Sequence, residues 1–143
     1  MLSDQRSLHS IQRLINLLQE GYTRHFSTKA DLQIRDGLIL RYKYLYEKSH
    51  KMLKRHLEMT APNPDIYDSM SFADLIRSGN EQALLRSDWT KWKVYREMRA
   101  KTSHTYDENT AVEVVSVISD FILEAQYLLD RLQKNHALQK HQN

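Results

Sequence analysis

The residues best suited to chemistry gather in one short stretch, 95–107, which reads YREMRAKTSHTYD. Histidine has an ordinary pKa of about 6.5, so His104 can give or accept a proton at neutral pH. The guanidinium of an arginine such as Arg99 can bind a phosphate through two parallel hydrogen bonds. No trio of carboxylates stands beside this pair. The Arg–His pair therefore indicates phosphodiester chemistry on RNA. In such a reaction the histidine takes the proton from a ribose 2′-hydroxyl group, and the arginine holds the phosphate.

The spacing within this stretch predicts how its side chains are presented. Intervals of three to four residues place four of them on one face of a helix: Trp92, Arg96, Arg99 and Ser103. Arg99 should then point toward a cleft or a partner surface, and we expect Arg96, Lys101 and Ser103 to help bind substrate. An alternative interpretation is that Arg99 pairs with an acidic neighbour and His104 completes a helix C-terminus. Spacing alone leaves both interpretations open.

Such a reaction needs both an acid and a base, but the stretch holds a single histidine. A two-fold dimer would bring a second His104 to the same cleft and supply both roles.

Metal and cofactor sites are not expected. His50 and His56 are six residues apart, and His136 and His141 are five apart. Neither pair has the i, i+4 spacing with which two helical histidines share a zinc ion. The chain also lacks a glycine-rich phosphate loop, so it should not itself use ATP as a nucleotidyltransferase does.

Composition predicts one helical domain. The chain has 143 residues, with 27% charged, 41% hydrophobic, three glycines, two prolines and no cysteine. So few turn residues indicate few, long elements. The net charge of +3 permits an anionic partner without requiring one. We see no signal peptide and no membrane span, so we expect a cytoplasmic protein.

Apolar periodicity predicts four to five helices in an antiparallel up-and-down bundle. The expected ranges are 3–25, 31–59, a short helix that Ser71 begins and Gly79–Asn80 ends, 87–103, and 109–136. Residues 81–85 are a candidate for a further helical turn. We expect Asn109 or Thr110 to cap the last helix, and we divide the chain into a single domain, 1–136, and a disordered tail, 137–143. The second helix is basic, which fits either an RNA backbone or a solvated face.

The run from Arg99 to Glu108, RAKTSHTYDE, followed by a helix that opens Asn-Thr-Ala, resembles the HEPN superfamily. Within it, the run is similar to the branch of helical proteins encoded beside a minimal nucleotidyltransferase. Residues 36–42 resemble the second helix of that branch, and residues 72–76 resemble its middle part. The resemblance covers about residues 30–132.

This resemblance implies an antiparallel helical bundle and a homodimer whose cleft joins two copies of the Arg–His motif. It also implies a toxin that cleaves RNA without a metal, with Arg99 binding the phosphate and His104 acting as acid or base. Tyr106 matches the tyrosine that the partner nucleotidyltransferase modifies with AMP. The added negative charge would repel RNA.

Two alternatives from other classes remain. The first is a non-catalytic subunit that binds the substrate of a two-component nucleotidyltransferase, and the second is a helical interaction protein with an inert cleft. Nuclease members of the branch usually carry a polar residue after the motif arginine, and here that position is Ala100. Ala100 favours the substrate-binding subunit, whereas His104 together with Tyr106 favours the ribonuclease.

Overall fold

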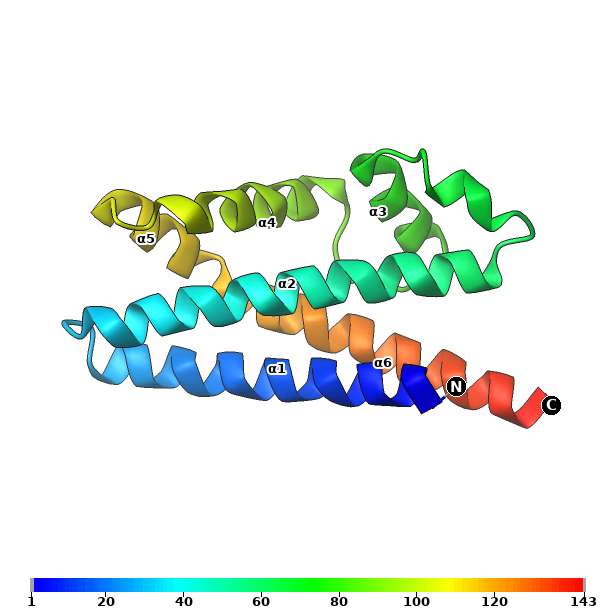
Figure 1. Ribbon diagram of the computed structural model, residues 1–143, viewed down its shortest axis with the longest axis horizontal. Coiled ribbons are helices and arrows are strands. Elements are labelled where there is room, and N and C mark those ends of the chain that lie inside the picture. The colour runs from blue at the N-terminus through cyan, green and yellow to red at the C-terminus, as the bar shows by residue number, and fades with distance from the viewer. Residues whose placement is uncertain (1, 143) are drawn as a thin grey trace.

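The computed structural model describes the backbone of residues 2–142 and the side chains of residues 5–136, and all regular structure in this part is helical. Figure 1 shows the elements in chain order: α1 (Leu2–Ser27), α2 (Leu32–Thr60), the 3-10 helix η1 (Pro64–Tyr67), α3 (Phe72–Glu81), α4 (Trp89–Lys101), the 3-10 helix η2 (Thr102–His104), α5 (Glu108–Ser116) and α6 (Ile118–Gln142). No helix in the described part is long and apolar enough to cross a membrane. The predicted all-α bundle is confirmed.

Helix α2 is the central element of the bundle. It contacts α1, α3, α4, α5, α6 and both 3-10 helices. In Figure 1, α1 runs antiparallel along one side of α2, with α6 beside it, while α3 and α4 lie along the other side. Asp31 begins α2, because its side chain accepts hydrogen bonds from the backbone N–H groups of Gln33 and Ile34. Three side chains that line the pocket described below extend from this helix: Tyr46, His50 and Lys54.

Large aromatic side chains fill the centre of the core. Tyr42, Trp92 and Phe121 are completely buried, and the hydroxyl of Tyr42 donates a hydrogen bond to the backbone carbonyl of Tyr95 at 2.7 Å. The alternating tyrosines of α2 do not form a strand. Tyr42 and Tyr46 lie one turn apart and are buried, whereas Tyr44 faces outward and is exposed. The helical period therefore decides the structure here, as the flanking sequence predicts.

The last predicted helix differs from the structure in two respects. It begins at Glu108, because Asp107 is the capping residue: its carboxylate accepts hydrogen bonds from the backbone N–H (3.1 Å) and hydroxyl (2.9 Å) of Thr110. The caps predicted at Asn109 and Thr110 are therefore wrong. The helix is also interrupted at Val117, between α5 and α6. The β-branched residues around Val117 have a lower helix propensity, which favours an interruption of the helix at this point.

The segment after α3 also departs from expectation. Helix α3 continues past Gly79–Asn80 to Glu81. Residues 82–88 then form an irregular loop with a turn at 82–83 and a bend at 86–87, rather than the further helical turn predicted for 81–85. The backbone N–H of Arg86 donates to the buried carboxylate of Glu124 at 2.7 Å. Burial raises the pKa of Glu124, while this hydrogen bond acts in the opposite direction. Glu124 thus holds the loop that leads into α4.

Helix α6 takes in residues 137–142, whose side chains the structure does not describe. The disordered tail over 137–143 therefore stays a prediction, as does the domain limit at residue 136.

Candidate functional site

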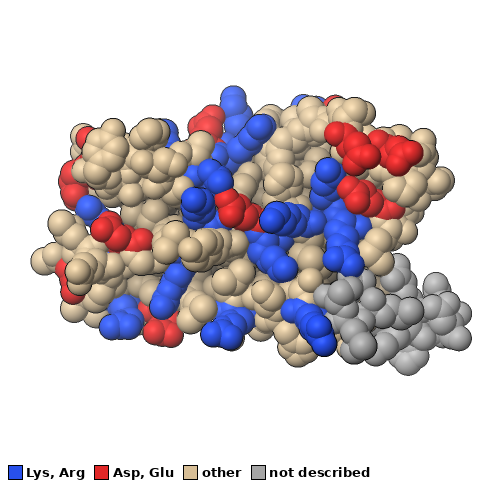
Figure 2. Space-filling view, in the orientation of Figure 1, with Lys and Arg blue, Asp and Glu red and all other residues tan. Residues whose placement is uncertain are grey.

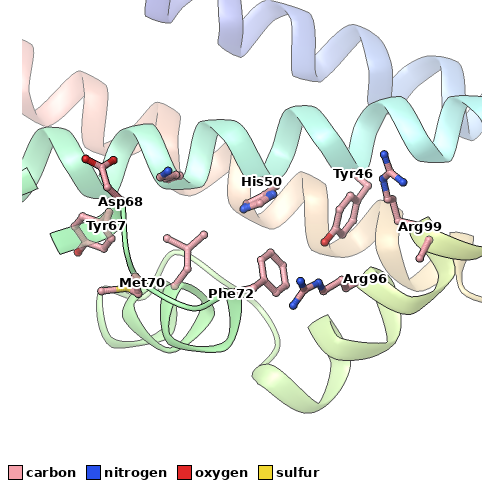
Figure 3. Close-up of a pocket in the computed structure, with 11 residues that line it drawn as sticks. Tyr46, His50, Tyr67, Asp68, Met70, Phe72, Arg96 and Arg99 are labelled. Atoms are coloured by element: carbon pink, nitrogen blue, oxygen red, sulfur yellow. The ribbon is translucent and has the colours of Figure 1, made fainter. Parts of the chain in front are cut away.

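A pocket of about 460 Å³ opens between α2, α4 and residues 67–75, which run from the end of η1 into the start of α3. Figure 3 shows the labelled side chains converging on it from these three parts of the chain. Its lining combines cations, aromatic rings and aliphatic groups: Tyr46, His50, Lys54, Tyr67, Asp68, Met70, Phe72, Leu75, Arg96, Arg99 and Ala100. Both arginines singled out in the sequence, Arg96 and Arg99, are among these residues and lie one helical turn apart on α4.

Three cationic side chains line the pocket. Arg96 and Arg99 extend from α4, and Lys54 extends from α2. The guanidinium of Arg96 lies over the ring of Phe72, 4.9 Å from its centroid, in a cation–π contact that orients the side chain. Figure 2 shows lysine and arginine side chains gathered over the middle of this face, where α2 and α4 run side by side. The arrangement suits an anionic ligand.

Arg99 forms an ion pair with Glu47 of α2, in which Nη2 donates to Oε1. The acidic neighbour expected by the alternative interpretation of the sequence is therefore present. Arg99 also lines the pocket, so the two interpretations are compatible. The two side chains are 34% and 38% exposed, so water screens the pair and leaves the guanidinium accessible.

His50 is a pocket residue that sequence reasoning considered only as a metal ligand. Its ring meets the ring of Phe72 edge-on, with centroids 4.8 Å apart. Burial lowers the pKa of His50, and the positive charges of Lys54, Arg96 and Lys51 lower it further. Tyr46, His50 and Lys54 recur at four-residue intervals, and this helical period is the sequence signal that could have found them.

Tyr46 forms the inner end of this row. Its ring is buried, and burial raises the pKa of its hydroxyl to about 12, although Arg96 and Arg99 act in the opposite direction. The hydroxyl therefore stays protonated at neutral pH and can donate a hydrogen bond to a ligand.

The remaining motif residues lie outside the pocket. His104 belongs to η2 and is exposed, as is Ser103. Tyr106 is 88% exposed, and its ring centroid is 6.2 Å from that of His104 in an edge-on arrangement. Within one chain, the structure thus brings together Arg96 and Arg99 and leaves His104 and Tyr106 together on the surface beyond the end of α4.

Lys101 is directed away from the pocket. Its ammonium group donates to Oε2 of Glu113 on α5 at 2.7 Å, and this hydrogen bond raises the pKa of Lys101. Glu113 therefore does not form the capping pair with Thr110 that its spacing suggests.

Among the side chains that the structure describes, no group of three or more histidines and carboxylates gathers as a metal site would require.

The fold and its arginine-lined pocket define a HEPN-type helical protein. The chain belongs to the family described as nucleotidyltransferase substrate binding protein like, whose model matches residues 6–134. The expected superfamily is therefore confirmed.

A curated protein and a solved structure, both from Haemophilus influenzae, are similar to this chain. One, described as a probable ribonuclease HepT, is 39% identical over 100 residues, which are 70% of this chain and 68% of that protein. The solved structure of HI0074, described as the fold of a substrate binding domain of a nucleotidyltransferase, superposes with a TM-score of 0.82 at 31% identity. The superposition covers 88% of this chain and 98% of HI0074.

Proposed function

We propose that the chain is the helical partner of a minimal nucleotidyltransferase and a metal-independent endoribonuclease of the toxin type. The observation that carries the proposal is the placement of Arg99. It lines an open cationic pocket at the end of α4, five residues before an exposed histidine. The description of the relative from Haemophilus influenzae as a probable ribonuclease supports it.

In this proposal Arg99 holds the phosphate that is attacked and stabilises the charge that builds on it. His104 takes the proton from the 2′-hydroxyl group or delivers one to the leaving oxygen. One chain supplies a single exposed motif histidine outside the pocket. A homodimer would place the second His104 opposite the first and complete the acid–base pair.

Tyr106 would be the point of regulation. Its side chain is almost fully exposed, so a partner nucleotidyltransferase has access to the hydroxyl. Its ring lies beside that of His104. An AMP group added there would bring a phosphate charge next to the acid–base residue and would compete electrostatically with RNA.

A second candidate is a non-catalytic subunit that presents a substrate to the nucleotidyltransferase. Two observations favour it. Ala100, which lines the pocket, offers no polar group to a substrate, and Glu47 already engages the guanidinium of Arg99.

RNA cleavage by the purified protein in excess EDTA tests the proposal. The parent should cleave, and His104→Ala should not. His9→Ala removes another exposed histidine, from α1, and should cleave like the parent. Cleavage by His104→Ala would indicate a contaminating nuclease. Absence of cleavage by the parent, shown by mass to carry no AMP, would overturn the nuclease and favour the second candidate.

A further inference from the structure

The pocket has a polarity that the Arg–His motif does not explain. In Figure 3, Arg96 and Arg99 lie at one end and Asp68 lies at the opposite end, with Phe72 and Met70 between them. Lys54, two helical turns beyond Tyr46 on α2, also lies toward the Asp68 end, and its ammonium group is 3.8 Å from the carboxylate of Glu58. A cationic end, an apolar middle and an end that carries a carboxylate match the three parts of a nucleotide. These are an anionic phosphate, the flat face of a base, and the amino group that adenine, cytosine and guanine carry.

The dimensions also suit one nucleotide. Tyr46, His50 and Lys54 form the floor along α2, and eight helical residues span about 12 Å at a rise of about 1.5 Å each. The pocket volume of about 460 Å³ lies within the range of about 300–1,000 Å³ usual for small-molecule sites.

Arg96 is the cation best placed to hold a phosphate. The Nζ atom of Lys54 lies 3.8 Å from Oε1 of Glu58, and Arg99 forms an ion pair with Glu47. In the described part of the chain, Arg96 is not in an ion pair with any carboxylate, and Phe72 fixes its guanidinium plane. A single uncompensated guanidinium indicates one bound phosphate rather than a long electrostatic track.

Arg96 and Arg99 are three residues apart on α4, so their side chains emerge about 5–6 Å from each other. A strand whose scissile phosphate is held by Arg99 would therefore present its neighbouring phosphate to Arg96.

We infer that this pocket is a subsite for one nucleotide of single-stranded RNA, with its phosphate on Arg96 and the amino group of its base on Asp68. The base lies against Phe72 and Met70, with the ring of His50 bordering it from α2. A carboxylate accepts a hydrogen bond from the N4 amino group of cytosine, whereas uracil carries an oxygen at that position. The subsite thus selects cytosine over uracil. The inference rests on the proposed function in taking RNA as the ligand.

The test measures binding rather than cleavage. Fluorescently labelled ten-residue oligocytidylate and oligouridylate, which have similarly sized bases, are titrated with His104→Ala protein, and anisotropy is recorded. We expect oligocytidylate to bind about fivefold more tightly than oligouridylate, the lower end of what a base-edge contact contributes. Asp68→Asn should remove this preference. Asp65→Asn, three residues earlier in η1 and outside the pocket lining, should keep it.

Arg96→Gln should weaken binding of both oligonucleotides by roughly tenfold, as expected for loss of a charge-assisted hydrogen bond. Arg77→Gln is the matched control, because Arg77 is exposed on α3 and pairs locally with Asp74 at 2.8 Å. Equal affinities for the two oligonucleotides in the parent would overturn the assignment of the base to Asp68. Unchanged affinities in Arg96→Gln would overturn the subsite as a whole.

The outcomes also separate this inference from the proposed function. A protein that cleaves RNA while Arg96→Gln and Asp68→Asn bind like the parent retains the function and loses the subsite. A protein that cleaves nothing but shows the preference for cytosine, and loses it in Asp68→Asn, retains the subsite and loses the nuclease.

Discussion

The guanidinium of Arg99 and the carboxylate of Glu47 join α4 to α2 at the edge of the pocket. The pair places the motif arginine where an anion can reach it, and at the same time offsets part of its charge. A phosphate that binds Arg99 must therefore compete with Glu47 or share the guanidinium with it. Under the proposed function, this competition makes Glu47 a residue that sets the affinity for RNA.

Replacing Glu47 by Gln should strengthen oligonucleotide binding to His104→Ala protein by about fivefold, the equivalent of about 1 kcal/mol for removing a nearby opposing charge in water. The stability should change by less than about 1 kcal/mol, because the pair is partly exposed. Fluorescence anisotropy and thermal unfolding measure the two effects. Glu20→Gln, which removes an exposed partner of Arg24 on α1, should change neither. Weaker binding in Glu47→Gln would show that Glu47 positions Arg99 for its ligand.

His50 should titrate below the ordinary range of histidine. Burial lowers its pKa, and nearby cations that include Arg96 lower it further. Because the folded pKa lies below the unfolded value of about 6.5, its contribution to stability is fully present above that value and is lost as the pH falls through the folded pKa. The difference in Tm between pH 7 and pH 5.5 should therefore be smaller in His50→Gln than in the parent.

The same histidine reports on Arg96. Arg96→Gln removes one of the positive charges that lower the pKa of His50, so the midpoint of the His50 ring signals in a proton NMR titration should rise. Arg77→Gln should leave the midpoint in place, since Arg77 is not among the charges that act on His50. An unchanged midpoint in Arg96→Gln would mean that the guanidinium does not lie against the ring of Phe72 in solution.

Tyr106 should be the residue that accepts AMP from the partner nucleotidyltransferase. Tyr106→Phe incubated with that enzyme and ATP should show no increase in mass, whereas the parent should gain one adenylyl group. Tyr44→Phe removes another exposed tyrosine hydroxyl, from α2, and should be modified like the parent. Both variants should unfold within about 0.5 kcal/mol of the parent, as is usual for exposed positions. Modification of Tyr106→Phe would move the regulatory site elsewhere.

Two helical glycines provide a matched test of the packing behind the pocket. A Cβ atom added at Gly79 of α3 would lie 2.9 Å from Leu85 Cδ1 and 3.2 Å from Leu53 Cδ1. Gly79→Ala should therefore lower the free energy of unfolding by about 1–3 kcal/mol through overpacking. A Cβ at Gly37 of α2 meets nothing within 4 Å, so Gly37→Ala should raise it by about 0.5–1 kcal/mol. Denaturant unfolding measures both, and a stabilised Gly79→Ala would contradict the close approach of α3 to α2.

The sequence predicts the long helices well because their apolar positions repeat over many turns, as in α2, where even the alternating tyrosines do not disturb the period. It fails where two local signals compete. Asp107, Asn109 and Thr110 all have side chains that can cap a helix, and only the tertiary position of the chain decides that Asp107 does so. The break at Val117 is hidden because the apolar face continues across it.

The pocket is harder to foresee than the helices. It combines residues 46–54, 67–75 and 96–100, and no local pattern shows that these three segments meet. The motif arginines were found from their chemistry. His50 and Phe72 gain significance only because the fold places both of them beside Arg96.

The central position of α2 gives the α2 side and the α3 side of the pocket different mechanical properties. Helix α2 contacts every other element, so the amides in its middle should exchange with solvent deuterium only through global unfolding. Helix α3 packs mainly on α2 and α4, and should exchange through smaller, local openings. The α2 side of the pocket is thus rigid, whereas the α3 side can open locally at a small cost in free energy. A bound nucleotide that contacts both sides would be detected as slower amide exchange confined to α3 and η1.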